Sequence, residues 1–91
     1  MSIQVRVPTV LRKHTDGEKV VQAQGATLRE VIDDLGQRNA DLTAALVDES
    51  GALRRFVNVY VNDEDVRYLG GIETPVSDGD TVSILPAVAG G

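Results

Sequence analysis

Residues 56–62 constrain the fold most, because this run of Phe-Val-Asn-Val-Tyr-Val-Asn is rich in β-branched and aromatic residues and alternates strictly. Both features are typical of a β-strand. Successive side chains of a strand point to opposite faces, so one face is expected to meet a core and the other to stay open. The core face would carry Val57, Val59 and Val61, and the open face Phe56, Asn58 and Tyr60.

Four other segments are predicted to be strands: residues 3–7, 18–23, 66–68 and 81–85. The first alternates apolar and polar side chains, which is typical of a half-buried strand. The second follows a turn predicted at Asp16-Gly17, and the last follows a turn predicted at residues 77–80. In the loop between the first two strands, Val10 and Leu11 are expected to tuck under the fold.

A helix is predicted to begin at Thr27, because Glu30 three residues later completes a capping box. Its apolar side chains recur at helical spacing and form one stripe, made of Leu28, Val31, Ile32 and Leu35. Such a stripe packs against a sheet. Gly36 weakens the helix near its end, and residues 39–47 are predicted to form a shorter helical piece. The anchoring residues of that piece are Leu42, Leu46 and Val47.

The predicted order is therefore strand, strand, helix, strand, short strand, strand. Because the first and last strands are both apolar, we expect them to lie side by side and parallel in the middle of the sheet, with the helix crossing one face. This arrangement is an α+β fold of the β-grasp, or ubiquitin-like, class, with a mixed sheet of four to five strands and one main helix. Residues 1–85 would form the domain, and residues 86–91 a flexible C-terminal tail.

The composition excludes several kinds of chemistry. The 91 residues suffice for one small domain with a modest core. They include no Cys and a single His, which excludes disulfides and thiolate catalysis and disfavours a zinc site. The net charge of −5 argues against nucleic-acid binding and favours partners with electropositive surfaces. No apolar run is long enough to span a membrane and no secretion signal is recognisable, so a cytoplasmic location is expected.

The acidic turns are interpreted as structural. Asp63, Glu64 and Asp65 follow one another in a turn, and this spacing does not make their oxygens converge on a metal ion. The Asp-Gly-Asp group at residues 78–80 is likewise a turn. His14 lies in a basic loop and is interpreted as uncommitted. The sequence therefore predicts no catalytic residue and no metal site within the chain.

The chain ends in Pro86-Ala87-Val88-Ala89-Gly90-Gly91, which carries no charged or bulky polar side chain. Its terminal carboxylate is ionised at neutral pH and is a poor electrophile until it is activated. The two glycines carry no Cβ that would hinder their approach to another enzyme's reactive centre. The tail spans at most about 20 Å, enough for the domain to dock outside a buried site that Gly91 enters. A frayed terminus is the simpler alternative.

The chain closes with Asp78-Gly79-Asp80, an apolar strand, Pro86 and Gly90-Gly91. This pattern resembles the ThiS/MoaD-type sulfur carriers. Two further segments, residues 8–12 and 56–67, resemble the CysO-type branch of that family, which supplies sulfur for cysteine biosynthesis. The molybdopterin branch usually has two successive prolines where this chain has Pro86-Ala87, which disfavours that branch.

The resemblance implies that the chain is a protein co-substrate and not an enzyme. An E1-like adenylating sulfurtransferase would use ATP and Mg²⁺ to activate the Gly91 carboxylate, and a sulfur donor would convert it into a thiocarboxylate. A PLP-dependent cysteine synthase would supply an acceptor made from O-phosphoserine, and a JAMM-type zinc metallopeptidase would release the cysteine. ATP, Mg²⁺, PLP and zinc belong to these partners, so this chain is expected to bind no cofactor itself.

Partner contacts are expected on the open sheet face and along the tail, because exposed aromatic side chains concentrate binding energy. The expected interface residues are Phe56, Tyr60, Leu85, Pro86, Ala87, Val88 and Ala89, with Gly90 and Gly91 as the chemically functional positions. Three alternatives remain open. The chain could be a ubiquitin-like modifier that forms isopeptide bonds through Gly91, a sulfur carrier for molybdopterin or thiamine thiazole synthesis, or a plain β-grasp interaction module.

Overall fold

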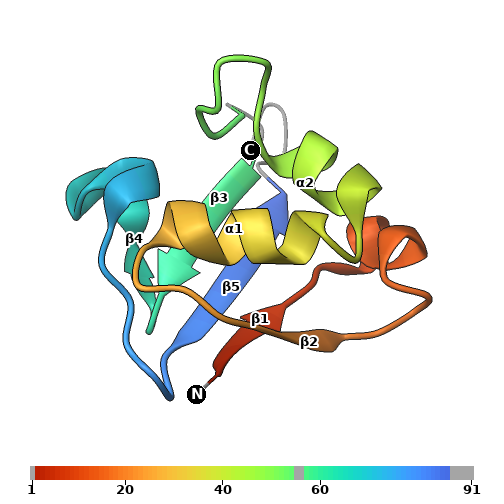
Figure 1. Ribbon diagram of the computed structural model, residues 1–91, viewed down its shortest axis with the longest axis horizontal. Coiled ribbons are helices and arrows are strands. Elements are labelled where there is room, and N and C mark those ends of the chain that lie inside the picture. Colours follow the sequence, from red (N-terminus) through yellow and green to blue (C-terminus); the bar gives the residue numbers. More distant parts are fainter. Residues whose placement is uncertain (1, 55–56, 87–91) are drawn as a thin grey trace.

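The computed structural model describes residues 2–54 and 57–86, which form a five-stranded sheet with helices on one face (Figure 1). The strands are β1 (Ile3–Arg6), β2 (Val20–Ala23), β3 (Val57–Val61), β4 (Glu64–Asp65) and β5 (Thr81–Pro86). The helices are α1 (Leu28–Gly36) and α2 (Ala40–Leu46), and three short 3-10 helices are η1 (Thr9–His14), η2 (Val66–Tyr68) and η3 (Gly71–Glu73). No helix in the described ranges is long and apolar enough to cross a membrane.

The sheet has the order β2-β1-β5-β3-β4, with the first and last long strands at its centre. β1 and β5 are parallel, and Val5 lies opposite Val82. β2 pairs antiparallel with β1, and β3 pairs antiparallel with both β5 and β4. The predicted β-grasp fold, with its mixed sheet and its parallel central pair, is confirmed.

Helix α1 crosses the inner face of the sheet and buries the predicted stripe (Figure 1). Its N-terminus is capped as expected, because the Thr27 hydroxyl accepts a hydrogen bond from the Glu30 backbone N–H at 3.3 Å. The reciprocal bond differs: the Glu30 carboxylate accepts from the N–H of Ala26, at 2.9 Å, instead of from that of Thr27. The stripe packs on the inward side chains of the strands, among them Val5, Val59, Val82 and Ile84.

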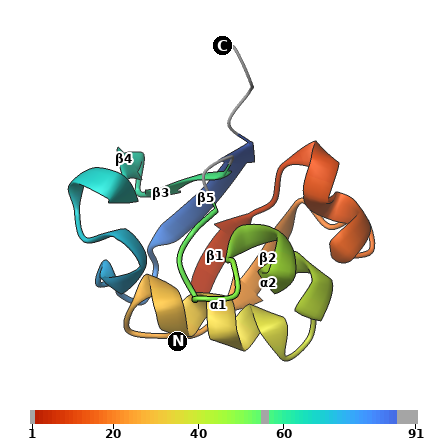
Figure 2. The same ribbon diagram turned by 90° about the horizontal axis from the view of Figure 1, so that it is seen from above.

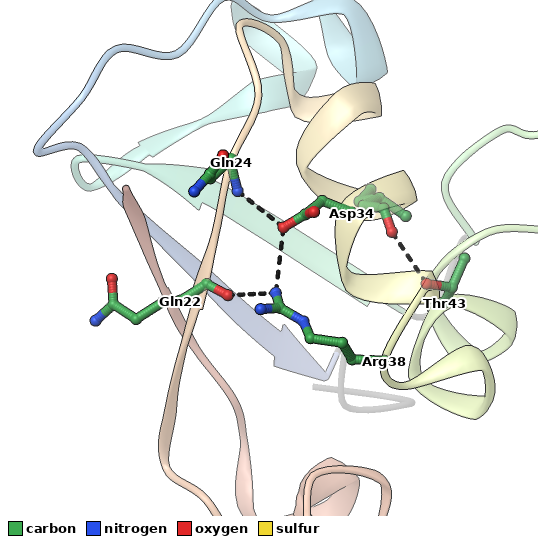
Figure 3. Close-up of polar contacts among 6 residues, drawn as sticks. Gln22, Gln24, Asp34, Arg38 and Thr43 are labelled. Carbon is green, nitrogen blue, oxygen red and sulfur yellow. Dashed lines mark hydrogen bonds and ion pairs between the residues drawn. The ribbon is translucent and has the colours of Figure 1, made fainter. Parts of the chain in front are cut away.

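The C-terminal end of α1 is tied to α2 and to the edge strand (Figure 3). Arg38 donates to the backbone carbonyl of Gln22 in β2 and also to the Asp34 carboxylate, at 3.2 Å. Thr43 in α2 donates from its hydroxyl to the carbonyl of Ile32, at 3.1 Å. At this point a Cβ added to Gly36 would lie 2.9 Å from the Thr43 Oγ1 atom. The two helices therefore approach closely at Gly36, a role that the sequence did not reveal.

Three local predictions are wrong. The turn predicted over Asp63, Glu64 and Asp65 is shorter than expected, because Glu64 and Asp65 form β4. Val10 is 59% exposed and is therefore not covered by the fold, whereas Leu11 is half-buried. Residues 66–68 form η2 and not a strand. The reason is local: the Asp65 carboxylate accepts a hydrogen bond from the Arg67 N–H at 2.9 Å, which caps a helical turn directly after the two residues of β4.

Candidate functional site at the root of the C-terminal tail

Strand β5 carries the chain from the protein interior to the root of the tail. It lies between β1 and β3, so its backbone is bonded on both sides. Val82 and Ile84 are buried, whereas Leu85 is 47% exposed on the open face. The strand ends at Pro86, opposite Val57 in β3. The sheet thus fixes where the tail begins and in which direction β5 enters it. Residues 87–91, which include Gly90 and Gly91, lie outside the described residues.

The Asp-Gly-Asp turn fixes the other end of β5 through the Asp80 carboxylate. Its Oδ2 accepts from the Ser77 N–H at 2.8 Å, and its Oδ1 accepts from the Asn62 side-chain amide at 2.9 Å. Asn62 Oδ1 in turn accepts from the Thr81 N–H at 3.0 Å. The Asn62 hydrogen bond, followed by that of Ser77, lowers the pKa of Asp80 below its ordinary value. We call this arrangement of Asn62, Ser77 and Asp80 the Asp80 clamp.

The same turn also holds Ser2 and the start of β1. The Ser2 N–H donates to the Asp78 carboxylate, and the Ser2 carbonyl accepts from the Gly79 N–H at 3.1 Å. The Gln4 N–H donates to the carbonyl of Asp80 at 3.1 Å. Gly79 has a φ of +90°, a conformation that favours glycine. The group predicted as a simple turn therefore sets the parallel register of β1 and β5.

A shallow groove of about 530 Å³ runs over the open face of the sheet beside the end of β5. Its floor follows the cross-strand register, in which Arg6 lies opposite Ser83 and Ser83 lies opposite Tyr60. Figure 2 shows the sheet along its edge, with α1 on one side and the open face on the other, and Arg12 of η1 lines the groove together with Leu85 of β5. We call it the tail-root groove, and its lining includes Arg6, Arg12, Lys19, Val20, Tyr60, Asp63, Ser83 and Leu85.

The groove brings together two of the predicted interface residues. Tyr60 is half-buried in the floor, and Leu85 lies at the end of β5 that leads into the tail. Pro86 forms the last residue of β5. Phe56 and Ala87, Val88 and Ala89 lie outside the described residues, so their part in an interface stays a prediction.

Sequence reasoning missed a second hollow, of about 210 Å³, on the other side of Leu85. It is lined by Val10 and Leu11 of η1, Ala45 of α2 and Val57 of β3. The exposed side chain of Val10 belongs to this hollow. Leu85 therefore lies between two surface depressions, and η1 contributes to the walls of both.

The charge of the tail-root groove is opposite to that of the whole chain. Arg6, Arg12 and Lys19 line it, whereas Asp63 is the one acidic side chain among the described residues of its lining. Arg12 is held in place, because its Nε donates to the carbonyl of Val7 at 3.2 Å. The net charge of the chain predicted a partner with an electropositive surface. The positive lining of this groove favours a partner with a negatively charged surface instead.

One of the three consecutive acidic residues after β3, of which Glu64 and Asp65 form β4, has a clear structural role. Asp65 forms an ion pair with Arg67, whose Nη2 lies 2.7 Å from Oδ2, and this contact lowers the pKa of Asp65. Within residues 2–54 and 57–86, no three His, Asp or Glu side chains gather in a way that could hold a metal ion.

Comparisons with known proteins cover the tail as well as the domain. The sequence profile of the ThiS family matches residues 5–91. The sulfur carrier protein CysO of Mycobacterium tuberculosis is 55% identical over 93 aligned residues, which cover all of both chains. The small archaeal modifier protein 3 of Haloferax volcanii is 39% identical over 66 residues, 72% of this chain and 71% of that protein.

The structural comparison agrees with the sequence comparison. A chain of the crystal structure of the Amycolatopsis orientalis BexX/CysO complex superimposes with a TM-score of 0.91 and 61% identity. The match covers 98% of this chain and 99% of that one. The family match reaches the final glycine, and the fold match covers the sheet that supports it. As the resemblance at its C-terminus predicted, this chain belongs to the ThiS family.

Proposed function

We propose that this chain is a sulfur carrier that holds sulfur as a thiocarboxylate on Gly91 and delivers it for cysteine synthesis. The observation that carries the proposal is the full-length, 55% identical relationship to a sulfur carrier protein, within a family whose profile extends to residue 91. A chain without cysteine has no thiol on which to carry sulfur. The terminal carboxylate is the group that can take that place.

The loading reaction needs activation, because a carboxylate is a poor acyl donor. An E1-like partner would transfer AMP from ATP to the Gly91 carboxylate and release pyrophosphate, with Mg²⁺ bound by that partner. Sulfide from a donor would then attack the acyl carbon, and AMP would leave with one of the original carboxylate oxygens. The product is a thiocarboxylate, in which sulfur has replaced that oxygen.

Delivery would return the carrier to its starting state. The thiocarboxylate sulfur would bond to the β-carbon of an acceptor derived from O-phosphoserine, with overall loss of phosphate, on a PLP-dependent partner. A shift of the Gly91 acyl group from sulfur to nitrogen would leave cysteine in amide linkage. Hydrolysis by a JAMM-type zinc metallopeptidase would release cysteine and restore the carboxylate. The protein would thus act as a co-substrate of its partners.

The described geometry supports a division between docking and chemistry. The Asp80 clamp and the two neighbours of β5 hold the root of the tail in place. The tail from Pro86 to Gly91 spans at most about 20 Å. A partner could therefore bind the sheet face while Gly91 reaches its reactive centre. The Amycolatopsis relative in complex with BexX supports the expectation of a protein partner.

The experiment is the intact mass of the protein after incubation with an E1-like adenylating enzyme from the same organism, ATP, Mg²⁺ and sulfide. We expect replacement of one oxygen by sulfur, localised to Gly91 by fragmentation, and dependence on ATP. A mass that stays unchanged in the complete reaction, while the same enzyme activates another carrier, would contradict the proposal.

A second function is favoured by one comparison. The 39% identical archaeal relative is described as a modifier protein, so an isopeptide-forming role for Gly91 is the alternative. The two functions differ in their products. A modifier would accumulate in cell extract as adducts on lysines of other proteins, whereas a carrier would be recovered unconjugated with a C-terminal thiocarboxylate.

A further inference from the structure

We propose that the tail-root groove binds an acidic segment of a partner protein, in which carboxylate side chains flank an apolar side chain. The inference rests on the proposed function, because it assigns a partner chemistry to the surface from which the tail departs. Three observations support it. The groove is lined by positive side chains, several cations elsewhere are already paired with acids, and apolar side chains lie between the charges of the groove.

The positive charge of the groove comes from three separate elements. Arg6 projects from β1, Arg12 from η1, and Lys19 from the residues that precede β2. The chain has 9 Lys and Arg against 14 Asp and Glu, so three cations with one facing acid reverse the average balance. Because the fold gathers residues distant in sequence, this local field is a property of the tertiary structure.

Several cations outside the groove are neutralised by acids. Arg29 pairs with Glu73 at 3.1 Å, and Arg38 pairs with Asp34 at 3.2 Å. Arg67 pairs with Asp65 in the same way. Among the described residues, Arg6, Arg12 and Lys19 take part in no ion pair. Their charge is therefore open to carboxylates from another molecule, which would be attracted over about 8–10 Å at physiological salt.

Apolar side chains lie between these charges and set the second requirement. Val20 is 40% exposed and Leu85 is 47% exposed, and both line the groove together with Tyr60. An aromatic ring and two aliphatic side chains can bury an apolar anchor, while the rim charges speed association and fix its register. A purely acidic segment would leave this apolar surface exposed to water. A basic segment would meet three like charges.

The test is an NMR titration of the full-length, isotope-labelled protein with a defined probe. The probe is a short synthetic peptide in which Glu residues flank one Leu, and its counterpart carries Lys in place of every Glu. We expect the acidic peptide to shift the amide signals of Arg6, Val20, Tyr60 and Ser83, and added salt to weaken its binding. We expect the basic peptide to leave these signals unchanged.

Charge-reversal variants make the assignment specific. Arg6→Glu and Lys19→Glu should each weaken binding of the acidic peptide by about three- to tenfold. Arg29→Glu is the matched control, because it makes the same change of charge outside the groove, and it should bind as the wild type does. The amide spectrum of each variant reports at the same time that the fold is retained.

The proposal and the proposed function can fail independently. The peptide titration involves no adenylation, so it tests the groove even if Gly91 never receives sulfur. With an activating enzyme that does load sulfur, Arg6→Glu and Lys19→Glu should raise KM and leave kcat unchanged, and Arg29→Glu should change neither. The inference would be overturned if the basic peptide shifted these signals, or if all variants bound the acidic peptide equally. It would also be overturned if the acidic peptide shifted no signal of the groove. Concentration-dependent groove shifts in the free protein would assign this surface to a second copy of the chain instead.

Discussion

Asn62 and Asp80 bind each other across the sheet, with the Asn62 amide donating to the Asp80 carboxylate at 2.9 Å while Asn62 Oδ1 accepts from the backbone of Thr81 at 3.0 Å. The two bonds join the turn after β3 to Asp80 and to Thr81, the first residue of β5. They lie at the end of β5 opposite to the tail, so they act on the tail through the position of the whole strand. Three predictions concern the stability of this scaffold, and a fourth concerns the chemistry of the tail.

Asp80→Asn should lower the free energy of unfolding by about 1–2 kcal/mol. The Asp80 carboxylate accepts from two donors, whereas an Asn side chain has one acceptor oxygen and would turn its NH₂ group toward one of those donors. Urea unfolding at neutral pH is the measurement, with an unchanged m-value expected. Asp33→Asn, at an exposed position of α1, is the control and should have little effect. Equal losses in both variants would contradict a stabilising clamp.

Stability should decrease on acidification, because the folded-state pKa values of three carboxyls lie below their ordinary value of 3.8. Such a group binds more protons in the unfolded chain, so its contribution is complete above the ordinary pKa and is lost as the pH falls through the lowered one. The carboxyls and the hydrogen-bonding side chains that lower them most are Asp48 with Ser50, Asp65 with Arg67, and Asp80 with Asn62.

The measurement is the urea midpoint as a function of pH. These groups should add no slope between about pH 7 and 5, and the midpoint should decline below about pH 4. Asp80→Asn should reduce the steepness of that decline, because one of the contributing groups is gone. A midpoint that rises on acidification below pH 4 would show that these carboxylates do not stabilise the fold.

Gly36→Ala should destabilise the protein even though alanine is the better helix former. Alanine in a helix interior gains up to about 1 kcal/mol over glycine. Here its Cβ would lie 2.9 Å from the Thr43 Oγ1, which is held by its bond to the Ile32 carbonyl, and the resulting overpacking costs about 1–3 kcal/mol. Thermal unfolding measures the net effect. Adding Thr43→Ala to Gly36→Ala should recover part of the loss, and a more stable Gly36→Ala single variant would contradict the close approach.

Much of the scaffold could be predicted because its signals are local. Alternation in residues 56–62 identified the buried valines of β3, and Thr27 with Glu30 located the start of α1. The parallel central pair could be predicted because both β1 and β5 are apolar, which favours a position between other strands in the middle of the sheet. Where local signals competed, prediction failed: residues 66–68 have strand-like composition, but the Asp65 cap turns them into η2.

The surface beside the tail could be predicted only in part. Tyr60 was placed on the open face by the period of its strand, and Leu85 was expected at the interface. Both line the tail-root groove. The cations of the groove come from residues 6, 12 and 19, and no linear pattern connects them. The net charge of −5 is a sum over the whole chain and does not report the sign of the charge on one face. Charge distribution follows from the topology, which places η1 and β2 on the same side of β5.

Deletion of Gly91 should leave the fold intact and lower thiocarboxylate formation at least about a hundredfold. The sheet ends at Pro86, so the urea midpoint should equal that of the wild type. The shortened tail still ends in a glycine carboxylate, but one residue short of its place in the partner's reactive centre, and misplacement by as little as 1 Å can cost about a hundredfold in rate. Intact mass after the loading reaction measures the loss. Gly91→Ala is the matched control, because it keeps the tail length and adds one methyl group, and it should load more slowly than the wild type but faster than the deletion. Near wild-type loading of the deletion variant would rule out Gly91 as the sulfur-bearing residue.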